Sequence, residues 1–498
     1  MHPDLGEVGG LGAMWYTGSL MAKLDKKVIY DNIHGYISLN RVESRILETS
    51  YYQRLRWIRQ LGFSFYIFPG ATHTRHAHAL GVLHVMDRIL NSIGHHVPEE
   101  KLFDPTARDA KTTFHRTMRL AAMLHDIGTF PFSHTIELAY VNHWRHQQQI
   151  GKTKYVANHE TLGSHIITNT DFEGGLTRIL KEEGIDPLEL SRIISGESSN
   201  LLANQLMHSD VDADRMDYLI RDAHHTGIKL GVFDMDFLIR NLVTVQHEGQ
   251  EILLVHEDAM NMVDAFLISR YFWYSQIIND GTGYKFDLIA AKIYEYFLEN
   301  GLAHSFEHLM EKVSQNPNEY FTFNDSYFLA KLHEYLAGRV MHPMIRELSE
   351  MLARRIPPAQ IKIPPVSPTL IESEDHRKEM VKKVTETVEW LQSELKTLDP
   401  EAWMIFDIPN KDVMFTKNHE AIKKTVKKGK NLMSPESVKI LSRHQEPKLL
   451  IDVSNSLMSI LSDYRNFIPR IYVSPKTYEL LEKNKILDAM RKREGASA

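Results

Sequence analysis

The sequence predicts a mainly α fold: a helical core, a small β-hairpin and a smaller mixed α+β region at the C-terminal end. Three observations predict it. Apolar residues recur at helical spacing from Tyr51 onward. Two β-rich runs flank a glycine turn at Gly249. A proline-rich stretch then precedes a segment in which helix and strand patterns alternate.

The core helices are predicted from apolar stripes in which residues recur every three or four positions. The stripes run through Leu55, Ile58 and Leu61, through Leu80, Leu83, Val85 and Leu90, and through Met118, Ala121, Ala122 and Leu124. Such stripes are typical of helices that pack one face against a shared core. Residues 241–247 and 251–256 are β-rich on either side of the glycine turn, which predicts a hairpin at the edge of the helices.

The chain divides into four predicted parts. Residues 1–25 are rich in glycine and poorly patterned, so we expect a leader or disordered segment there. Residues 26–355 form the predicted helical domain. The five prolines between residues 356 and 368 disfavour a helix or a central strand, and they predict a linker over residues 356–373. Residues 374–498 form the predicted C-terminal α+β region.

Within this C-terminal region the pattern predicts a long helix followed by short strands. The helix is expected over about residues 374–398, and the strands near 404–408 and 471–473. The segment also carries a basic stretch, made of Lys417, Lys423, Lys424, Lys427, Lys428 and Lys430. A single charge run is most often a solvated face, so it supports nucleic-acid binding only weakly.

The composition excludes several classes of protein. The 498 residues contain no cysteine, which rules out disulfide frameworks, thiolate metal sites and cysteine nucleophiles, and fits a reducing compartment. No apolar run of about 18 residues is present, so we expect a soluble, cytoplasmic protein without a membrane partner. A net charge of −6 argues against a strong overall field that attracts nucleic acid.

Three separate segments carry residues that bind metals. An apolar helix ends in the adjacent pair His125-Asp126, and an upstream helix begins near His78. Downstream, Asp214 belongs to a run of carboxylates in which Asp210, Asp214, Asp217, Tyr218 and Arg221 share one helix face. Imidazole and carboxylate ligands together suit a divalent ion such as Mn, Fe, Ni, Zn or Mg.

Each of these segments also has an ordinary structural explanation. A lone His-Asp pair is most often a surface or capping pair, and a helix rich in carboxylates is most often a solvated face. Here, however, Met216, Leu219 and Ile220 interrupt the carboxylates, so one side of that helix must be buried. The joint occurrence of three such segments favours one shared metal site.

These segments lie within a longer series of motifs that resembles the HD-domain deoxynucleoside triphosphate triphosphohydrolases. The motifs begin at Val28-Ile-Tyr-Asp-Asn-Ile-His-Gly-Tyr-Ile, continue through Gln53-Arg-Leu-Arg-Trp-Ile-Arg-Gln-Leu-Gly, Phe68-Pro-Gly-Ala-Thr-His-Thr-Arg-His-Ala-His-Ala-Leu-Gly and His125-Asp-Ile-Gly-Thr-Phe-Pro-Phe-Ser-His, and end with Asp212-Ala-Asp-Arg-Met-Asp-Tyr-Leu-Ile-Arg-Asp and His224-His-Thr-Gly-Ile. The resemblance covers about residues 27–285. It implies an HD-domain helical core for the predicted domain.

The resemblance also implies roles for individual residues. His78, His125, Asp126 and Asp214 take the metal-ligand positions for one divalent ion per subunit, and His134, Glu137 and His159 take the catalytic acid and base positions. Gln60, Leu61, Arg75, Tyr218, Asp222, Arg270 and Tyr274 match positions around the nucleotide substrate. The implied reaction is hydrolysis of a deoxynucleoside triphosphate to deoxynucleoside and tripolyphosphate.

The pattern departs from the family at three positions around the reacting phosphates. Thr129 stands where the family has histidine, and Ile278 and Asp280 replace a tyrosine and a histidine. An aspartate near a triphosphate costs Coulomb energy. Two alternatives therefore remain open: an HD phosphohydrolase that acts on another phosphorylated substrate, and a nucleotide-binding or nucleic-acid-binding protein with little turnover.

The resemblance further implies a nucleotide activator and a homo-oligomer, dimer or tetramer. Lys27, Glu48 and Arg56 match the positions that bind the activator, but Tyr30 and Glu48 differ from the usual residues there. No heptad or other symmetric signature in the sequence indicates the number of subunits.

Overall fold

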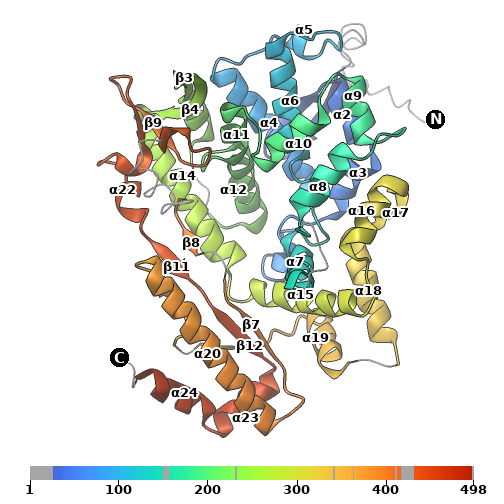
Figure 1. Ribbon diagram of the computed structural model, residues 1–498, viewed down its shortest axis with the longest axis vertical. Helices are drawn as coiled ribbons and strands as arrows, with labels where there is room; N and C mark the ends of the chain where they lie inside the picture. The colour runs from blue at the N-terminus through green and yellow to red at the C-terminus, as the bar shows by residue number, and fades with distance from the viewer. Residues whose placement is uncertain are drawn as a thin grey trace, which may run out of the picture.

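The computed structural model describes residues 26–149, 156–229, 233–339, 342–362, 364–409, 412–416 and 431–495. The predicted segment 1–25 and the basic stretch of lysines between residues 417 and 430 lie outside these ranges. The fold is mainly α, as the sequence predicts, with several small sheets (Figure 1).

The first part of the chain is a hairpin followed by a bundle of helices. The hairpin pairs β1 (Lys27–Asp31) with β2 (Gly35–Leu39) in antiparallel register. The helices are α2 (Arg41–Leu47), α3 (Ser50–Arg54), η1 (Leu55–Trp57), η2 (Gly62–Tyr66), α4 (Arg75–Ser92), α5 (Glu99–Leu102), α6 (Ala110–Leu124), α7 (His134–Gln149), α8 (His159–Thr168), α9 (Leu176–Glu182), α10 (Pro187–Ser195), α11 (Leu201–His208), α12 (Ala213–Thr226) and α13 (Met235–Arg240).

The predicted hairpin after this bundle is confirmed. β3 (Leu242–His247) pairs antiparallel with β4 (Gln250–His256). A second group of helices follows: η3 (Glu257–Ala259), α14 (Met260–Trp273), the π-helical turn η4 (Tyr274–Ile278), α15 (Gly283–Glu299), α16 (Phe306–Gln315), α17 (Pro317–Thr322), α18 (Asp325–Ala337) and α19 (Pro343–Ala353). In Figure 1, α14 runs diagonally from the β3–β4 hairpin toward α15 and thereby connects the two ends of the helical region.

The C-terminal region mixes short strands with helices. Its elements are β5 (Ala359–Ile361), β6 (Thr369–Leu370), α20 (Glu374–Leu398), β7 (Met404–Asp407), β8 (Val413–Met414), η5 (Asn431–Met433), β9 (Lys439–Leu441), β10 (Pro447–Leu449), η6 (Leu450–Asp452), α22 (Met458–Leu461), β11 (Arg465–Phe467), β12 (Arg470–Val473), α23 (Pro475–Lys483) and α24 (Ile486–Gly495). The predicted helix and both predicted strands are present, and the two strands, β7 and β12, pair with each other.

Two hydrophobic cores hold these regions. The larger core lies among the bundle helices and buries, among others, Leu83, Leu120 and Leu124. A smaller one lies between α20, α23 and the β5–β12–β7 sheet and buries Leu391 and Ile471. The proline-rich residues 356–373 contribute the edge strands β5 and β6 to small sheets of the C-terminal region. The boundaries at residues 355 and 373 stay predictions.

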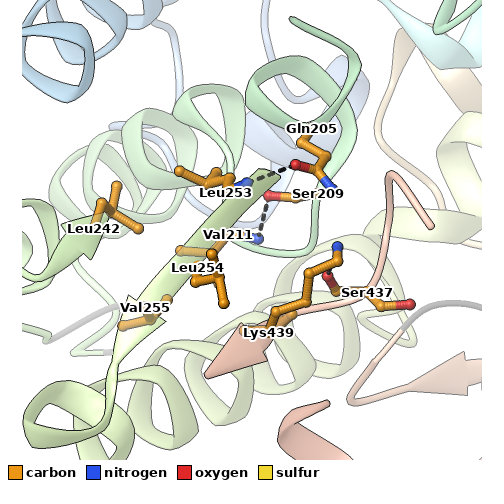
Figure 2. A pocket seen from close by; sticks show the side chains of 10 residues that line it. Gln205, Ser209, Val211, Leu242, Leu253, Leu254, Val255, Ser437 and Lys439 are labelled. Carbon is orange, nitrogen blue, oxygen red and sulfur yellow. Dashed lines mark hydrogen bonds between the residues drawn. The ribbon is translucent and has the colours of Figure 1, made fainter. Parts of the chain in front are cut away.

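The C-terminal region also pairs directly with the bundle. β9 adds a parallel strand to β4, which creates a four-stranded sheet in the order β10–β9–β4–β3. Figure 2 shows Lys439 of β9 beside this junction. The Lys439 side chain is buried and donates to the carbonyl oxygens of Ser434 and Ser437, and burial lowers its pKa to about 7. The junction adjoins the turn that leads into α12.

No helix in the described ranges combines the length and the apolar character that a membrane span requires.

Candidate metal centre and its surroundings

Three helices bring the predicted metal ligands together. α6 begins at an Asp109 cap, buries Leu120 and Leu124, and ends at His125, so that His125 and Asp126 emerge from its C-terminal end. The first turn of α4 carries His78, and the first turn of α12 carries Asp214. Since α4 packs against both other helices, three segments distant in sequence meet at one point.

Three of the predicted ligands, His78, His125 and Asp214, have ligand atoms that all lie within 4.8 Å of one another, and Asp126 lies beside the two imidazoles. His78 Nε2 is 3.0 Å from Asp214 Oδ1 and 3.8 Å from Asp126 Oδ2. His125 Nε2 is 3.4 Å from Asp126 Oδ2 and 3.7 Å from Asp214 Oδ1. Ligands that share one cation at bond lengths of about 2.1 Å are separated by roughly 3.0–3.5 Å. The spacing therefore fits a single small divalent ion.

Hydrogen bonds fix the tautomer of both histidines. His78 Nδ1 donates to Asp217 Oδ2 at 2.7 Å, and His125 Nδ1 donates to the Ala122 carbonyl oxygen at 2.8 Å. Each Nε2 then faces the other predicted ligands: that of His125 is buried without a hydrogen-bond partner, and that of His78 lies 3.0 Å from Asp214 Oδ1. Because a buried polar atom without a partner is costly, this arrangement fits two histidines prepared to bind a cation.

Ion pairs among these side chains shift their pKa values strongly. Burial alone lowers the pKa of His78, but its bonds to Asp214 and Asp217 raise that pKa to about 10, so the ring holds a proton at neutral pH that a bound cation would displace. Burial raises the pKa of Asp126, yet Arg75 and the nearby histidines hold it well below its usual range. The carboxylates are therefore ionised at neutral pH, as metal ligands must be.

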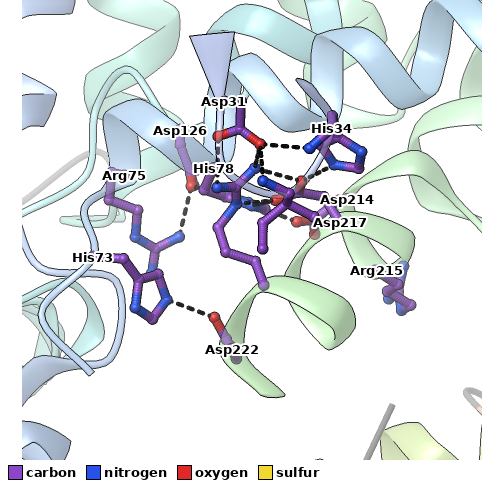
Figure 3. Close-up of polar contacts among 12 residues, drawn as sticks. Asp31, His34, His73, Arg75, His78, Asp126, Asp214, Arg215, Asp217 and Asp222 are labelled. Atoms are coloured by element: carbon purple, nitrogen blue, oxygen red, sulfur yellow. Dashed lines mark hydrogen bonds and ion pairs between the residues drawn. The ribbon is translucent and has the colours of Figure 1, made fainter. Parts of the chain in front are cut away.

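Arg75 contacts Asp126, one of the predicted metal ligands. Its Nη1 donates to Asp126 Oδ2 at 2.6 Å, and its Nε donates to Ser133 Oγ at 2.9 Å (Figure 3). The side chain is buried. The predicted phosphate ligand is thus engaged with a carboxylate in this structure.

A second cluster joins the three predicted acid and base residues. Glu137 Oε2 accepts from His134 Nδ1 at 2.6 Å, and Glu137 Oε1 accepts from His159 Nδ1 at 2.6 Å. Burial lowers the pKa of His159, but Glu137 raises it to about 9, so this ring holds a proton at neutral pH. His159 is close enough to Asp126 to lower the pKa of that carboxyl, which places the cluster beside the metal ligands.

The loop between the two clusters is tightly constrained. A Cβ at Gly128 would lie 2.2 Å from the His159 carbonyl oxygen, so only glycine allows α8 to approach this closely. Phe132 and Ser133 both adopt positive φ angles, of 50° and 56°. Such backbone strain persists where the surroundings over-determine it and is common at functional sites.

The predicted substrate residues surround this region in two groups. Gln60 and Leu61 are buried next to Arg75, whose Nη2 lies 3.5 Å from the Gln60 carbonyl oxygen. Tyr218 packs on Trp273 with ring centroids 4.5 Å apart, and Trp273 Nε1 donates to Asp222 Oδ2 at 2.8 Å.

Arg270 and Tyr274 form part of the second group. The Arg270 guanidinium lies 5.7 Å from the Tyr274 ring centroid, and its Nη1 donates to Asp210 Oδ1 at 2.7 Å. Both residues lie where α14 passes into the π-helical turn η4. Like Arg75, Arg270 is therefore paired with a buried carboxylate.

The three positions that depart from the family have structural explanations of their own. Thr129 is buried and its Oγ1 has no hydrogen-bond partner. Asp280 Oδ2 accepts from the backbone N–H groups of Thr282 and Gly283, at 2.9 and 2.7 Å, and so stabilises the start of α15. Ile278 packs against a small apolar cluster around Leu61.

The predicted activator residues lie on the surface. Lys27 Nζ and Glu48 Oε1 form an exposed ion pair of 2.9 Å. Arg56 instead donates to Gln53 Oε1 at 2.8 Å. Their assignment to an activator site stays a prediction.

The sequence analysis does not identify the residues that orient the predicted metal ligands. Asp31 and His34, in the N-terminal hairpin, reach the metal region through Asp217 and Arg221. Their signal was present, because Asp31 and His34 belong to the first motif of the family resemblance. The sequence analysis places the buried Asp217 only on a helix face and gives it no role at the site.

The comparison with protein families agrees with this geometry. Residues 75–222 match the family model described as HD domain, and this range contains all four predicted metal ligands. The chain carries an HD domain. The chain is similar over 225 residues to the human deoxynucleoside triphosphate triphosphohydrolase SAMHD1, with 31% identity, 41% of this chain and 34% of that protein covered.

Microbial relatives are similar over stretches of comparable length. An uncharacterized protein of Mycoplasma pneumoniae is 32% identical over 240 residues, which cover 47% of this chain and 51% of that protein. One from Methanocaldococcus jannaschii is 30% identical over 251 residues, which cover 50% and 45%. The HD protein spans about half the length of the curated relatives it matches.

Solved structures match over more of the chain. A hypothetical protein from Aquifex aeolicus superposes with a TM-score of 0.62 at 25% identity, covering 91% of this chain and 98% of that one. A phosphohydrolase from Bacteroides thetaiotaomicron gives a TM-score of 0.60 at 19% identity, covering 90% and 99%, and shows the shared fold.

Proposed function

We propose that this HD protein is a metal-dependent phosphohydrolase that hydrolyses deoxynucleoside triphosphates to deoxynucleoside and tripolyphosphate. The observation that carries the proposal is that ligand atoms of His78, His125 and Asp214 all lie within 4.8 Å of one another, with Asp126 Oδ2 3.8 Å and 3.4 Å from the two imidazole Nε2 atoms. The similarity to the human triphosphohydrolase supports the choice of substrate.

His78, His125, Asp126 and Asp214 would hold one divalent ion per subunit. Bound there, the ion would polarise a phosphoryl oxygen and lower the pKa of water. Mn, Fe, Mg, Ni and Zn all suit such a ligand set. Asp217 and the Ala122 carbonyl keep both imidazoles in the tautomer that this binding needs.

The His134–Glu137–His159 cluster would handle the proton of the reaction. Water attacks the α-phosphorus, the bond between this phosphorus and the 5′-oxygen breaks, and the leaving deoxynucleoside oxygen takes up a proton. His159 holds a proton at neutral pH because Glu137 accepts its Nδ1–H. Its remaining nitrogen is the donor in our proposal, and Glu137 stabilises the cation before transfer.

The remaining predicted residues would recognise the nucleotide. Tyr218 and Tyr274 offer aromatic surface beside Asp222, and Arg75 and Arg270 offer guanidinium groups for phosphate oxygens. Both arginines are paired with carboxylates in this structure, so phosphate binding requires each to exchange or share its partner.

A second function is favoured by a specific observation. Thr129 contributes no imidazole, and by the resemblance Asp280 puts a carboxylate where the family has a histidine. These features favour an HD phosphohydrolase that acts on a substrate with fewer phosphate charges.

A substrate screen separates the proposals. Purified protein is incubated with Mn, Mg, Fe, Ni or Zn and with deoxynucleoside triphosphates, ribonucleoside triphosphates, monophosphates or cyclic dinucleotides, and products are resolved by ion-exchange chromatography. Release of tripolyphosphate from deoxynucleoside triphosphates supports the main proposal. Turnover confined to another compound supports the second, and tight nucleotide binding without turnover contradicts both.

Replacing Thr129 tests whether the missing imidazole limits the reaction. We expect Thr129→His to raise kcat for a deoxynucleoside triphosphate by at least roughly tenfold, a part of the roughly 10²- to 10⁴-fold that a well-placed general acid or base typically contributes. Thr129→Ser serves as the control for perturbing this buried position. An unchanged or lower kcat in the folded histidine variant would refute the explanation.

A further inference from the structure

The carboxylate of Asp217 is a central junction behind the metal ligands. Its Oδ2 accepts from His78 Nδ1 at 2.7 Å and from Arg221 Nε at 2.8 Å. Its Oδ1 accepts from His34 Nε2 at 2.6 Å and from Arg221 Nη2 at 2.9 Å. Both oxygens are thus used twice, and Asp217 is completely buried (Figure 3).

His34 reaches this junction from the tip of the β1–β2 hairpin, 183 positions away in the sequence. Asp31 Oδ2 accepts from the backbone N–H groups of Ile33 and His34, which shapes the turn. The carboxylate of Asp31 also accepts from both terminal nitrogens of Arg221, at 2.9 and 3.1 Å. The backbone of the hairpin tip and the His34 side chain are therefore both held by the buried group of Asp31, Asp217 and Arg221.

Apolar packing holds the hairpin independently of His34. Ile37 and Leu39 are buried in the main core. The other face of the hairpin carries Tyr30 and Tyr36, which are 69% and 75% exposed. The His34 imidazole, by contrast, is only 3% exposed and directs its Nε2 to Asp217. Since Ile37 and Leu39 also attach the hairpin to the core, the bond of the buried His34 ring is not its only anchor.

We propose that His34 is a positioning residue for the metal centre. By donating to Asp217 Oδ1, His34 fixes the carboxylate that accepts His78 Nδ1–H, and so fixes the orientation of the Nε2 lone pair of His78. Partners of metal-ligating histidines commonly change metal affinity by roughly 10- to 100-fold. The inference rests on the proposed function only in that His78 binds a metal.

The test measures metal affinity rather than turnover. Mn²⁺ is titrated into the full chain and free Mn²⁺ is followed by electron paramagnetic resonance. All proteins carry His308→Ala and His134→Ala, because His304, His308 and Glu319 form a second cluster of potential metal ligands among the described residues, and His134, Glu137 and His159 form a third. His34→Phe keeps an aromatic ring but removes the donor, and His34→Gln retains an N–H close to the position of Nε2.

We expect His34→Phe to weaken Mn²⁺ binding about 10- to 100-fold and His34→Gln to restore it to within about threefold of the parent. Tyr36→Ala, on the exposed face of the same hairpin, should bind as the parent does. Equal affinity of the phenylalanine variant and the parent would overturn the inference, as would equally weak binding by the glutamine variant. A parent that binds no Mn²⁺, Zn²⁺ or Ni²⁺ at this site would instead overturn the proposed function.

Discussion

The candidate site has a half predicted to bind a metal and a half predicted to bind phosphate. The two differ in how nearly their side chains are arranged for a ligand. In the metal half, His78 and His125 are oriented by bonds to their Nδ1 atoms, and their Nε2 atoms face the carboxylates of Asp214 and Asp126. In the phosphate half, Arg75 and Arg270 already donate to Asp126 and Asp210. The cation-binding half is therefore ready for its ligand, whereas the anion-binding half must give up or share existing ion pairs.

This difference follows from electrostatics. Buried carboxylates without a cation are costly, and the arginines supply positive charge next to them. A divalent ion between Asp126 and Asp214 would supply that charge instead. We therefore expect metal binding to loosen the hold of Asp126 on Arg75 and make its guanidinium more available to phosphate.

The largest effect is expected from removing the ligands that α6 provides. His125→Ala combined with Asp126→Ala leaves two of four ligands, so bound metal after dialysis should fall below about a tenth of the parent level. Metal content is measured by inductively coupled plasma mass spectrometry. The control is the His308→Ala variant, which should retain metal at the HD site. Parent-level metal in the double variant, corrected for the His304–His308–Glu319 cluster, would refute the assigned ligands.

A smaller effect is expected from a substitution that displaces Asp217, the hydrogen-bond partner of His78. A Cβ at Gly81 would lie 1.9 Å from Asp217 Oδ1 and 2.4 Å from Arg221 Nη2. Gly81→Ala must displace Asp217, so we expect metal affinity to fall about tenfold or more and the free energy of unfolding to drop by about 1–3 kcal/mol.

Gly163→Ala is the matched control for this change, because it is also a helical glycine of the HD domain but its Cβ would meet its nearest neighbour at 3.5 Å. Metal titration and thermal unfolding of both variants check the prediction. If the two alanine variants behave alike, the close approach at Gly81 has no bearing on the metal half.

The phosphate half offers a change in the opposite direction. Asp210→Asn keeps the shape of the side chain that holds Arg270 but removes its charge, so Arg270 should turn to phosphate more readily. We expect KM for the triphosphate to fall roughly two- to fivefold with little change in kcat, since the ion pair competes with ground-state binding. Asp264→Asn, a buried aspartate that accepts from Ser456 and Leu457, is the control. A higher KM for Asp210→Asn would show that Asp210 orients Arg270 productively.

The contrast between the halves also explains what the sequence predicts well. His78, His125, Asp126 and Asp214 are recognisable because each is an uncommon residue type at a defined point of a helical motif, and the helices converge through ordinary core packing. Likewise, the hairpin of β3 and β4 and the helix α20 follow from local patterns.

The partners of these residues are harder to predict. His34 meets Asp217 across 183 positions, and Asp210 meets Arg270 across 60, and no local periodicity encodes either pair. The same holds for β9, whose parallel pairing with β4 joins the C-terminal region to the bundle. Such contacts depend on the complete packing of the chain, so motif and spacing reveal the ligands but not what orients or competes with them.

Replacing Asp287, a buried carboxylate next to the start of α7, should change catalysis least and stability most clearly. Asp287 Oδ1 accepts from Thr135 Oγ1 at 2.6 Å and from the Phe63 N–H at 3.1 Å, and burial raises the pKa of Asp287 to about 6 from its ordinary 3.8. The folded chain therefore binds this proton more tightly than the unfolded chain. The stabilising contribution is fully present below about pH 4 and is lost as the pH rises through 6.

Asp287→Asn should remove this dependence, because its amide oxygen still accepts both hydrogen bonds but does not ionise. Between pH 4.5 and 7.5 the free energy of unfolding of the parent, relative to the variant, should decline by about 1–2 kcal/mol. Urea unfolding at several pH values measures this difference. Asp171→Asn, at an exposed ion pair with Lys181, controls for the loss of one negative charge. A constant difference between parent and Asp287→Asn over this range would mean that Asp287 is ionised throughout, and that Thr135 at the start of α7 donates to a charged rather than a protonated group.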